Sequence, residues 1–309
     1  MYGTVCGAGQ TPRLFFETEA AVITHRIPDC VGEMPARRYI RRAWPLLAER
    51  EVRQAFARRD VKRNGARIAP EDTVRGGDEL AVYINASFPL DVLFDDGRLL
   101  AVCKPQGLPV DVDREGVGAD TLLERLRAYN PNARLLHRLD AQTGGVLLAA
   151  LDEETYARGL TAFRERQLRK RYRAVALGPF ENQTGELKDY IAKDAKRATV
   201  RVLRHPGEGA KPIVTRYRVL ESLGRGFSLV ELEPVTGRTH QLRAHMAFYG
   251  HPLLGDDKYG NRESKAARLH LWCRCVEPLA GALGQYEGRR FTAPEPDWGK
   301  EFGHSPDRL

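Results

Sequence analysis

The order of apolar and polar positions along this chain predicts a mixture of helices and strands. An apolar run at residues 146–151 directly follows two glycines, which predicts a buried strand that begins at a tight turn. Residues 152–167 start with acids and end with bases, which is the order that the helix dipole favours, so a helix is predicted there. Residues 168–177 change from basic to apolar, which predicts a strand that runs into the core. Alternating patterns predict further strands at 198–203, 213–220, 227–232 and 270–275, and a helix is expected at 239–249.

The pattern in the first third of the chain predicts a small folded unit that precedes the rest of the protein. Residues 50–58 predict a helix with one apolar face, and an Asn-Gly pair predicts a hairpin turn within residues 61–68. Further along, Thr121 and Glu124 form a capping box at the start of a predicted helix that ends at residue 129. Other expected features are strands at 20–24, 76–83, 90–94 and 99–103, a linker at 87–89, and irregular segments at 1–13 and after 294.

Positive charge is concentrated in the smaller unit. The chain has a net charge of +8, and residues 36–67 alone contain eleven basic and three acidic residues, so the remainder has 38 of each sign. A basic surface of this kind favours a polyanionic partner such as RNA. The alternative, arginines that only solvate a helix face, predicts interspersed acids, which are nearly absent here.

Composition argues against several other classes of protein. The five cysteines are odd in number and scattered, unlike a disulfide framework, and His270, Cys273 and Cys275 lack the second ligand pair of a zinc site. The sequence contains neither a phosphate-binding glycine motif nor an apolar run of about 20 residues. We therefore expect a cytoplasmic protein that is not in the membrane and uses no metal and no cofactor.

One acidic residue occupies a position suited to catalysis. Asp140 ends the sequence HRLD, stands next to a predicted core strand, and has no other acid within ten residues on either side. A carboxylate that a nearby cation keeps ionised can act as a nucleophile or a base. A salt-bridged turn aspartate is the commoner explanation for an isolated residue of this kind. A second motif makes a catalytic role for Asp140 the better explanation.

The second motif is the sequence TGRTHQLR at residues 236–243, with Gly255-Asp256 following it. Together with HRLD it resembles the RluA/RluC/RluD family of RNA pseudouridine synthases, over residues 88–295. The sequences KPQG at 104–107 and KRY at 170–172 stand where that family has its K-P-x-G and K-x-Y elements. One difference is Gly144, which stands where the family often has a serine, so the turn lacks a hydroxyl that could stiffen it.

The resemblance implies an α+β pseudouridine synthase fold, in which a mixed, largely antiparallel central sheet with flanking helices carries a central RNA cleft. The basic unit resembles the small RNA-binding domain of the ribosomal-protein S-four type, although the usual Leu-Asp of its first helix is absent around Tyr39. The expected division is an N-terminal extension (1–34), a basic RNA-binding domain (35–86), a catalytic domain (87–295) and an irregular tail (296–309).

The resemblance also implies roles for individual residues. Asp140 is the catalytic group, Arg243 is its ion-pair partner, and Tyr172 stacks on the target base. Arg138 matches an arginine that fills the space left by a flipped nucleotide. Together with Arg138, the residues expected to bind RNA are Arg37, Arg38, Arg41, Arg42, Arg53, Arg58, Lys62, Arg63, Lys170, Arg171, Arg238 and His240.

The activity that these residues imply is conversion of a specific uridine in structured RNA to pseudouridine by a monomeric isomerase. Ribosomal RNA is expected in preference to transfer RNA. The main alternative is a non-catalytic RNA-binding or ribosome-assembly factor on the same fold, but Asp140, Tyr172 and Arg243 are all intact. An N-glycosidase using the same carboxylate is a third hypothesis, and it would release free uracil. Attack of Asp140 on the sugar carbon and proton abstraction to give a glycal both stay open.

Overall fold

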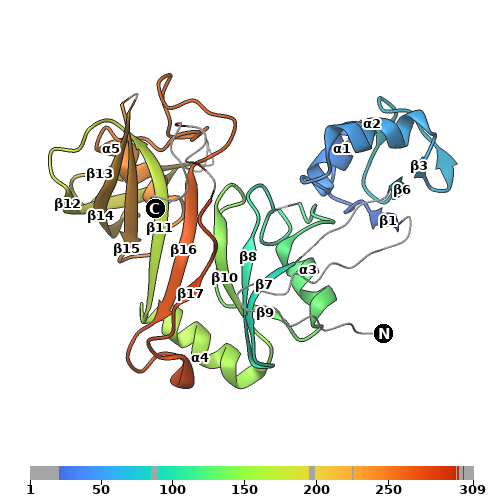
Figure 1. The fold of residues 1–309 in the computed structure, drawn as a ribbon. Coiled ribbons are helices and arrows are strands. Elements are labelled where there is room, and N and C mark those ends of the chain that lie inside the picture. The colour runs from blue at the N-terminus through green and yellow to red at the C-terminus, as the bar shows by residue number, and fades with distance from the viewer. Residues whose placement is uncertain are drawn as a thin grey trace.

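A computed structural model describes residues 21–84, 90–113, 115–194, 199–224, 226–296, 298 and 302. In these ranges the chain forms a small sheet and a large sheet, each with its own hydrophobic cluster (Figure 1). The expected irregular segment 1–13, the linker at 87–89 and most of the tail lie outside the described residues. The proposed domain boundaries therefore stay predictions.

The small unit contains two helices, the second of which covers the helix predicted near residues 50–58, and it contains the predicted hairpin. Asn64 (φ 50°) and Gly65 (φ 80°) both have left-handed backbone angles, which is the geometry that an Asn-Gly hairpin turn requires. Strand β1 pairs with β6, so residues 21–26 of the expected N-terminal extension belong to this sheet. The sheet order is β1-β6-β3-β4, and β2 pairs with β5. The elements are β1 (Ala21–Arg26), β2 (Met34–Pro35), α1 (Ala36–Ala43), α2 (Glu49–Ala57), β3 (Val61–Arg63), β4 (Ala66–Arg67), β5 (Thr73–Val74) and β6 (Glu79–Ile84).

The large sheet is mixed and mostly antiparallel, which confirms the predicted α+β class. Its order in the described chain is β13-β12-β14-β15-β11-β16-β10-β8-β7, with β17 beside β16 and β9 beside β10. Among the described pairings, only β10 with β16 is parallel. The strands are β7 (Asp91–Asp95), β8 (Leu99–Lys104), β9 (Arg134–Leu135), β10 (Gly144–Ala150), β11 (Leu168–Leu177), β12 (Thr184–Asp194), β13 (Thr199–Leu203), β14 (Lys211–Gly224), β15 (Phe227–Pro234), β16 (Leu271–Pro278) and β17 (Phe291–Thr292).

Three α-helices and one 3-10 helix accompany this sheet in the described chain: α3 (Leu122–Tyr129), α4 (Glu153–Arg164), α5 (Gln241–Phe248) and η1 (Gly284–Tyr286). Strands β8 and β10 are buried along their whole length, as expected for strands covered on both faces. Helix α4 contacts β10 and lies below the sheet in the view of Figure 1. None of the described helices combines the length and apolar character that crossing a membrane requires.

Two predicted helix ends differ from the observed ones, and one predicted capping box is only half formed. Helix α4 ends before the predicted residue 167, because Arg166 has a left-handed φ of 59° and the chain enters β11 directly afterwards. Helix α5 starts two residues later than predicted, because His240 also has a left-handed φ, of 51°. At α3 the Thr121 hydroxyl accepts from Glu124 N as expected, but the Glu124 carboxylate pairs with Arg127 (3.2 Å).

The small unit contacts residues 111–120 of the chain that follows it. Arg42 donates from Nε (2.9 Å) and Nη2 (2.6 Å) to Asp113, and Nη2 also lies 2.9 Å from Glu115. Asp120 N donates to Ala43 O (3.0 Å), and Val117 is buried in the hydrophobic cluster of the small unit. One arginine of the basic stretch is therefore neutralised by two acids from outside that stretch.

Candidate active site

Asp140 lies in the turn that leads into β10. Its backbone carbonyl accepts a hydrogen bond from Thr143 N (3.0 Å). Gly145 has φ 104°, and a Cβ built on it would lie 2.2 Å from Cys273 O, so a larger residue does not fit this position. The Asp140 side chain is 29% exposed. Its carboxylate is thus open to a ligand, although the backbone that carries it is fixed.

Lys104 ties this turn to the end of β8. It is fully buried, and its Nζ donates to the carbonyl oxygens of Pro105 (2.9 Å), Leu108 (2.7 Å) and Ala141 (3.0 Å). Three acceptors match the three donors of an ammonium group. Burial lowers the pKa of Lys104 to about 7, and the charge of Asp140 opposes that shift. The residue next to Asp140 is thereby held by a buried side chain from another strand.

Arg243 connects Asp140 to two further carboxylates. Its Nε and Nη2 donate to the two oxygens of Asp256 (2.8 and 2.7 Å), and Nη2 also donates to Asp257 (2.9 Å). Nη1 lies 3.7 Å from Asp140 Oδ2. Burial alone would lower the pKa of Arg243, but the hydrogen bonds and charge of Asp256, followed by the charges of Asp140 and Asp257, raise it above its ordinary value. Arg243 is therefore a permanent buried cation, oriented mainly by Asp256.

His240 is the second basic side chain beside Asp140. Its Nε2 lies 3.8 Å from Asp140 Oδ2, and its Nδ1 lies 2.8 Å from the hydroxyl of Tyr259. Burial lowers the pKa of His240, the charge of Asp140 opposes this, and Arg243 adds to the lowering. The imidazole is then mostly neutral at pH 7. Its left-handed backbone costs about 1–3 kcal/mol for a residue other than glycine, a strain that folded proteins tend to retain at functional sites.

Tyr172 is 7% exposed and lies opposite Cys273 on the neighbouring strand. Its hydroxyl and the Cys273 thiol are hydrogen-bond partners. Burial raises the pKa of Tyr172 well above its ordinary value, and Cys273 and the charge of Asp140 raise it further. At neutral pH the side chain is a protonated phenol, so it can supply an aromatic ring and a donor but not a phenolate base.

Of the three described carboxylates beside Arg243, Asp140 is the one that has no hydrogen bond to the guanidinium. The Asp256 side chain is completely buried against Arg243, and Asp257, although its side chain is 71% exposed, is hydrogen-bonded to the same guanidinium. A glycosidase would use a second carboxyl group as acid or base across the scissile bond. The arrangement instead suits a reaction in which Asp140 attacks a sugar carbon, or removes a proton beside it, and the base that leaves stays bound.

The candidate RNA-binding residues fall into exposed and paired groups. Arg138 is exposed next to Asp140, and the Nε of Arg238 is buried without a hydrogen-bond partner in the described structure. Lys170 is partly buried, with its Nζ 5.7 Å from the Phe163 ring, and burial lowers its pKa. In the small unit Arg38, Arg53 and Arg58 are exposed. Paired residues are Arg37 with Glu71 (3.3 Å), Arg41 with Glu49 (3.1 Å), Arg171 with Glu277 (3.4 Å), Lys62 with Tyr83 (3.4 Å) and Arg63 with Thr73 O.

Sequence reasoning missed the role of Asp256. The motif around Gly255 was recognisable, but nothing in it assigns a partner to the aspartate. Gly255 has φ 76°, and a Cβ there would lie 1.8 Å from Arg268 O, so the glycine lets two chain segments approach closely. This approach, which no local pattern specifies, accompanies the placement of Asp256 beside Arg243.

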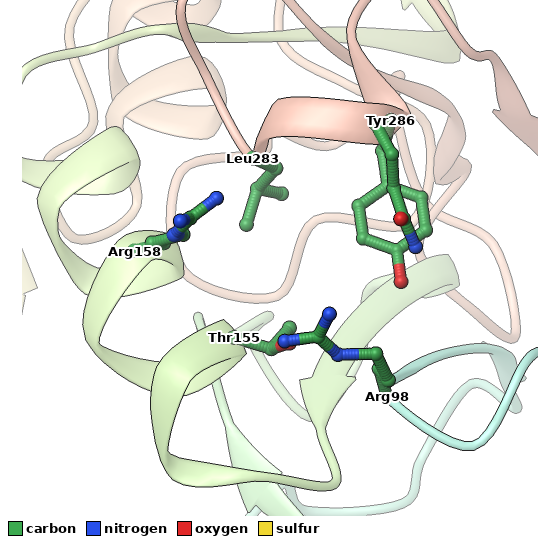
Figure 2. A pocket seen from close by; sticks show the side chains of 6 residues that line it. Arg98, Thr155, Arg158, Leu283 and Tyr286 are labelled. Carbon is green, nitrogen blue, oxygen red and sulfur yellow. The ribbon is translucent and has the colours of Figure 1, made fainter.

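A separate polar pocket lies at the start of α4 (Figure 2). Arg98 pairs with Asp152 (3.0 Å) and Glu154, and Arg158 pairs with Glu154 (2.8 Å). Because acids neutralise both arginines, the pocket has little attraction for an anion. None of the predicted site residues lines it, and the described part of the chain has no cluster of three or more His, Cys, Asp or Glu suited to a metal. Its lining residues are Arg98, Thr155, Arg158, Leu283, Gln285 and Tyr286.

Comparisons with known proteins point to a single family of enzymes. The sequence profile described as RNA pseudouridylate synthase matches residues 98–248. The chain is 32% identical over 282 residues to ribosomal large subunit pseudouridine synthase C of Rickettsia conorii, covering 82% of this chain and 92% of that protein. It is 33% identical over 225 residues to the protein of the same name from Escherichia coli K12, covering 66% and 69%. Among solved structures, human RNA pseudouridylate synthase domain containing 1 has a TM-score of 0.58 and 28% identity, covering 68% of this chain and 85% of that one.

Proposed function

This chain belongs to the RNA pseudouridylate synthase family, and we propose that it modifies ribosomal RNA of the large subunit with Asp140 as the catalytic carboxylate. Its activity is that of an isomerase that converts uridine in RNA to pseudouridine. The choice of RNA rests on relatives named for the large ribosomal subunit. The choice of Asp140 rests on one observation: it is a partly exposed carboxylate 3.7 Å from a buried arginine that other acids hold in place.

The reaction needs a carboxylate next to the sugar. The bond between ribose and the uracil nitrogen breaks, the base turns, and a ring carbon forms the new bond to ribose. That carbon loses its hydrogen as a proton, and the freed nitrogen takes one up. Asp140 either attacks the sugar carbon, in which case its bond to the sugar breaks as the ring carbon bonds, or removes the proton from the neighbouring carbon and returns it afterwards. Arg243 places a fixed positive charge 3.7 Å from that carboxylate, and the base must leave the RNA stack to reach it. The atoms of substrate and product are the same, so no co-reactant is needed.

Mapping of pseudouridines in the RNA of a deletion strain and its parent tests this function. We expect specific pseudouridines of large-subunit ribosomal RNA to be missing in the deletion strain and restored by the intact gene. Purified protein should release tritium from RNA labelled at the uracil carbon that forms the new bond. Loss of sites only in transfer RNA would overturn the proposed substrate. Release of free uracil would favour the N-glycosidase, and no change at all would favour the non-catalytic RNA-binding factor.

We further propose that the small unit supplies RNA affinity through its exposed arginines, as a domain of the ribosomal-protein S-four type would. Arg53 lies on α2 and Arg58 directly follows it, and neither pairs with a described carboxylate. Arg42, by contrast, is committed to Asp113 and Glu115. An arginine that already has an acidic partner contributes less to RNA affinity, because the acid and the phosphate compete for the same N–H donors. The three residues therefore allow exposed and paired charges to be compared within one unit.

Changing Arg53 and Arg58 to Gln together should weaken RNA binding and make it less dependent on salt. Each phosphate contact that is lost should reduce the slope of log affinity against log salt by about 1. Arg42→Gln is the matched control and should leave that slope almost unchanged. Binding is measured by titration of a fixed RNA fragment at several salt concentrations. Equal slopes in the wild type and the double variant would show that this face of α2 does not meet RNA.

Tyr172→Ala should lose capture of the target base, since stacking of a base on an aromatic ring contributes about 1–3 kcal/mol. Tyr172→Phe keeps the ring and loses only a hydroxyl that is protonated and bound to Cys273. We expect Phe to retain most of kcat/KM and Ala to lose a factor of about 5–150, the range that this energy implies. Tritium release and RNA binding are measured in parallel. If Phe binds RNA normally but is as inactive as Ala, the hydroxyl takes part in proton transfer.

A further inference from the structure

Strand β16 lies between the two strands that carry the proposed site. It pairs in parallel with the start of β10, where Gly144 lies opposite Trp272 and Gly145 opposite Cys273. On its other side it pairs with β11, where Tyr172 lies opposite Cys273. The register on this side shifts between Arg171 and Tyr172, as at a β-bulge, and such irregularities often redirect a side chain near an active site. The adjacent residues Trp272 and Cys273 therefore touch both the Asp140 turn and the strand of Tyr172.

The contact between Trp272 and Gly144 is unusually close. A Cβ built on Gly144 would lie 2.2 Å from Cζ3 and 2.6 Å from Cε3 of the indole, and 2.9 Å from Cγ of Gln106. Gly144 does not have a positive φ, so its backbone alone would accept another residue. The requirement for glycine is thus imposed by the ring of Trp272 and by Gln106, which occupy the space of a side chain at position 144.

The groups that occupy this space are themselves fixed. The indole Nε1 of Trp272 donates to Pro294 O (3.0 Å), and the ring packs against two hydrophobic clusters of the large sheet. Gln106 Nε2 donates to the carbonyls of Gln142 (3.0 Å) and Leu269 (2.6 Å). One side of the turn from Asp140 to Gly144 is consequently held by an immobile ring and an anchored amide.

We propose that Trp272 is a positioning residue for Asp140, an inference that rests on the proposed function of that carboxylate. The ring takes the space of the side chain at position 144 and restrains the turn by packing. The turn is thereby held in place, and the carboxylate four residues earlier keeps its position beside Arg243. Misplacement of a reacting group by about 1 Å can cost a factor of about 100 in rate.

Three variants test this assignment: Gly144→Ser, Trp272→Leu and the two combined. Gly144→Ser should lower kcat by about a hundred-fold with KM for RNA nearly unchanged, because the new Cβ pushes the turn away from the ring. Trp272→Leu should lower kcat by about ten-fold, because the turn loses its packing partner. The double variant removes the two closest contacts of the new side chain and leaves only the one to Gln106 at 2.9 Å, so its kcat should exceed that of Gly144→Ser by about ten-fold.

Two controls separate positioning from general destabilisation. Leu223→Ala removes an apolar side chain from the hydrophobic cluster that Trp272 also contacts, and it should lower the melting temperature without lowering kcat. Trp272→Phe keeps an aromatic ring and should recover most of the kcat that Trp272→Leu loses. Full kcat in Gly144→Ser or Trp272→Leu, or a double variant no better than Gly144→Ser, would overturn the proposal. Failure of the proposed function looks different, because the wild-type protein would then release no tritium.

Discussion

Asp140→Asn is expected to abolish pseudouridine formation while leaving the folded protein and its RNA affinity nearly intact. Asparagine has almost the same shape as aspartate but no charge, so it can neither attack the sugar nor accept its proton. Loss of a group of this kind lowers turnover by roughly a thousand-fold or more. The free energy of unfolding should change by less than about 1 kcal/mol, because Asp140 is partly exposed and Arg243 keeps Asp256 and Asp257 as partners.

The measurement is tritium release from RNA labelled at the uracil carbon that forms the new bond, with RNA affinity measured beside it. Asp257→Asn is the matched comparison, because Asp257 is also an aspartate bonded to Arg243 but its side chain is 71% exposed. We expect that variant to lose less than a factor of about ten, since a surface ion pair contributes about 0–1 kcal/mol. Turnover by Asp140→Asn within ten-fold of the wild type would remove Asp140 from the mechanism.

The turn that carries Asp140 could be predicted from the sequence because its signals are local. Two glycines next to an apolar run have few structural interpretations, and the strand found at residues 144–150 is buried throughout, as the run predicted. The Asn64-Gly65 hairpin and the apolar face of α2 are predictable for the same reason. Each depends on residues that are neighbours in the chain.

Several partners of the charged residues could not be predicted, because they come from distant parts of the chain. The family resemblance paired Arg243 with Asp140, and the two lie 3.7 Å apart, but the shortest hydrogen bonds of Arg243 go to Asp256, in a loop after α5. Counting charges over residues 36–67 likewise missed the acids that neutralise Arg42 from residues 113 and 115. A charge count along the chain measures the total that a segment carries but not the part that remains free to meet a ligand.

Packing contacts were equally invisible in the sequence. The glycine at position 144 suggested a looser turn, yet the ring of Trp272 fills the space, and these two residues are separated by more than a hundred positions. The left-handed backbone of His240 was also unexpected, because only a few per cent of non-glycine residues have a positive φ, even though histidine does so more often than most. Both features depend on how β16 and α5 pack around the turn.

Asp256→Asn should produce the largest loss of stability among these substitutions. Asn keeps an oxygen that can accept from Lys258 N (2.9 Å) and Tyr259 N (3.0 Å), but it leaves the 3% exposed Arg243 without its buried counter-charge. Removing one member of a buried ion pair costs about 3–5 kcal/mol. We expect about 3 kcal/mol in the free energy of unfolding from urea titrations, because Asp257 remains. Activity should fall as well, since Arg243 is no longer oriented toward Asp140.

The pH dependence of stability should change in the same variant. Burial raises the pKa of Asp256, but the hydrogen bonds and charge of Arg243 lower it more. The resulting pKa lies below the ordinary value of 3.8. A depressed folded-state pKa gives stability that is present above the unfolded pKa and is lost as the pH falls through the folded one. The wild type should therefore lose stability on acidification below about pH 4, where the aspartate of the unfolded chain takes up a proton. Asp256→Asn should not show this decrease in the free energy of unfolding at low pH. The same decrease in the wild type and the variant would show that protonation of Asp256 does not cause it.

Combining Asp256→Asn with Arg243→Met separates stability from catalysis. Replacing both members of a buried ion pair removes the uncompensated charge, so the double variant should regain most of the roughly 3 kcal/mol that Asp256→Asn alone loses. It should regain no activity, because the guanidinium that lies 3.7 Å from Asp140 is gone. Urea unfolding and tritium release on the same preparations give the two quantities. A double variant that is stable and active would show that Arg243 serves only the fold, and one that is no more stable than Asp256→Asn would show that the two residues do not act as a pair.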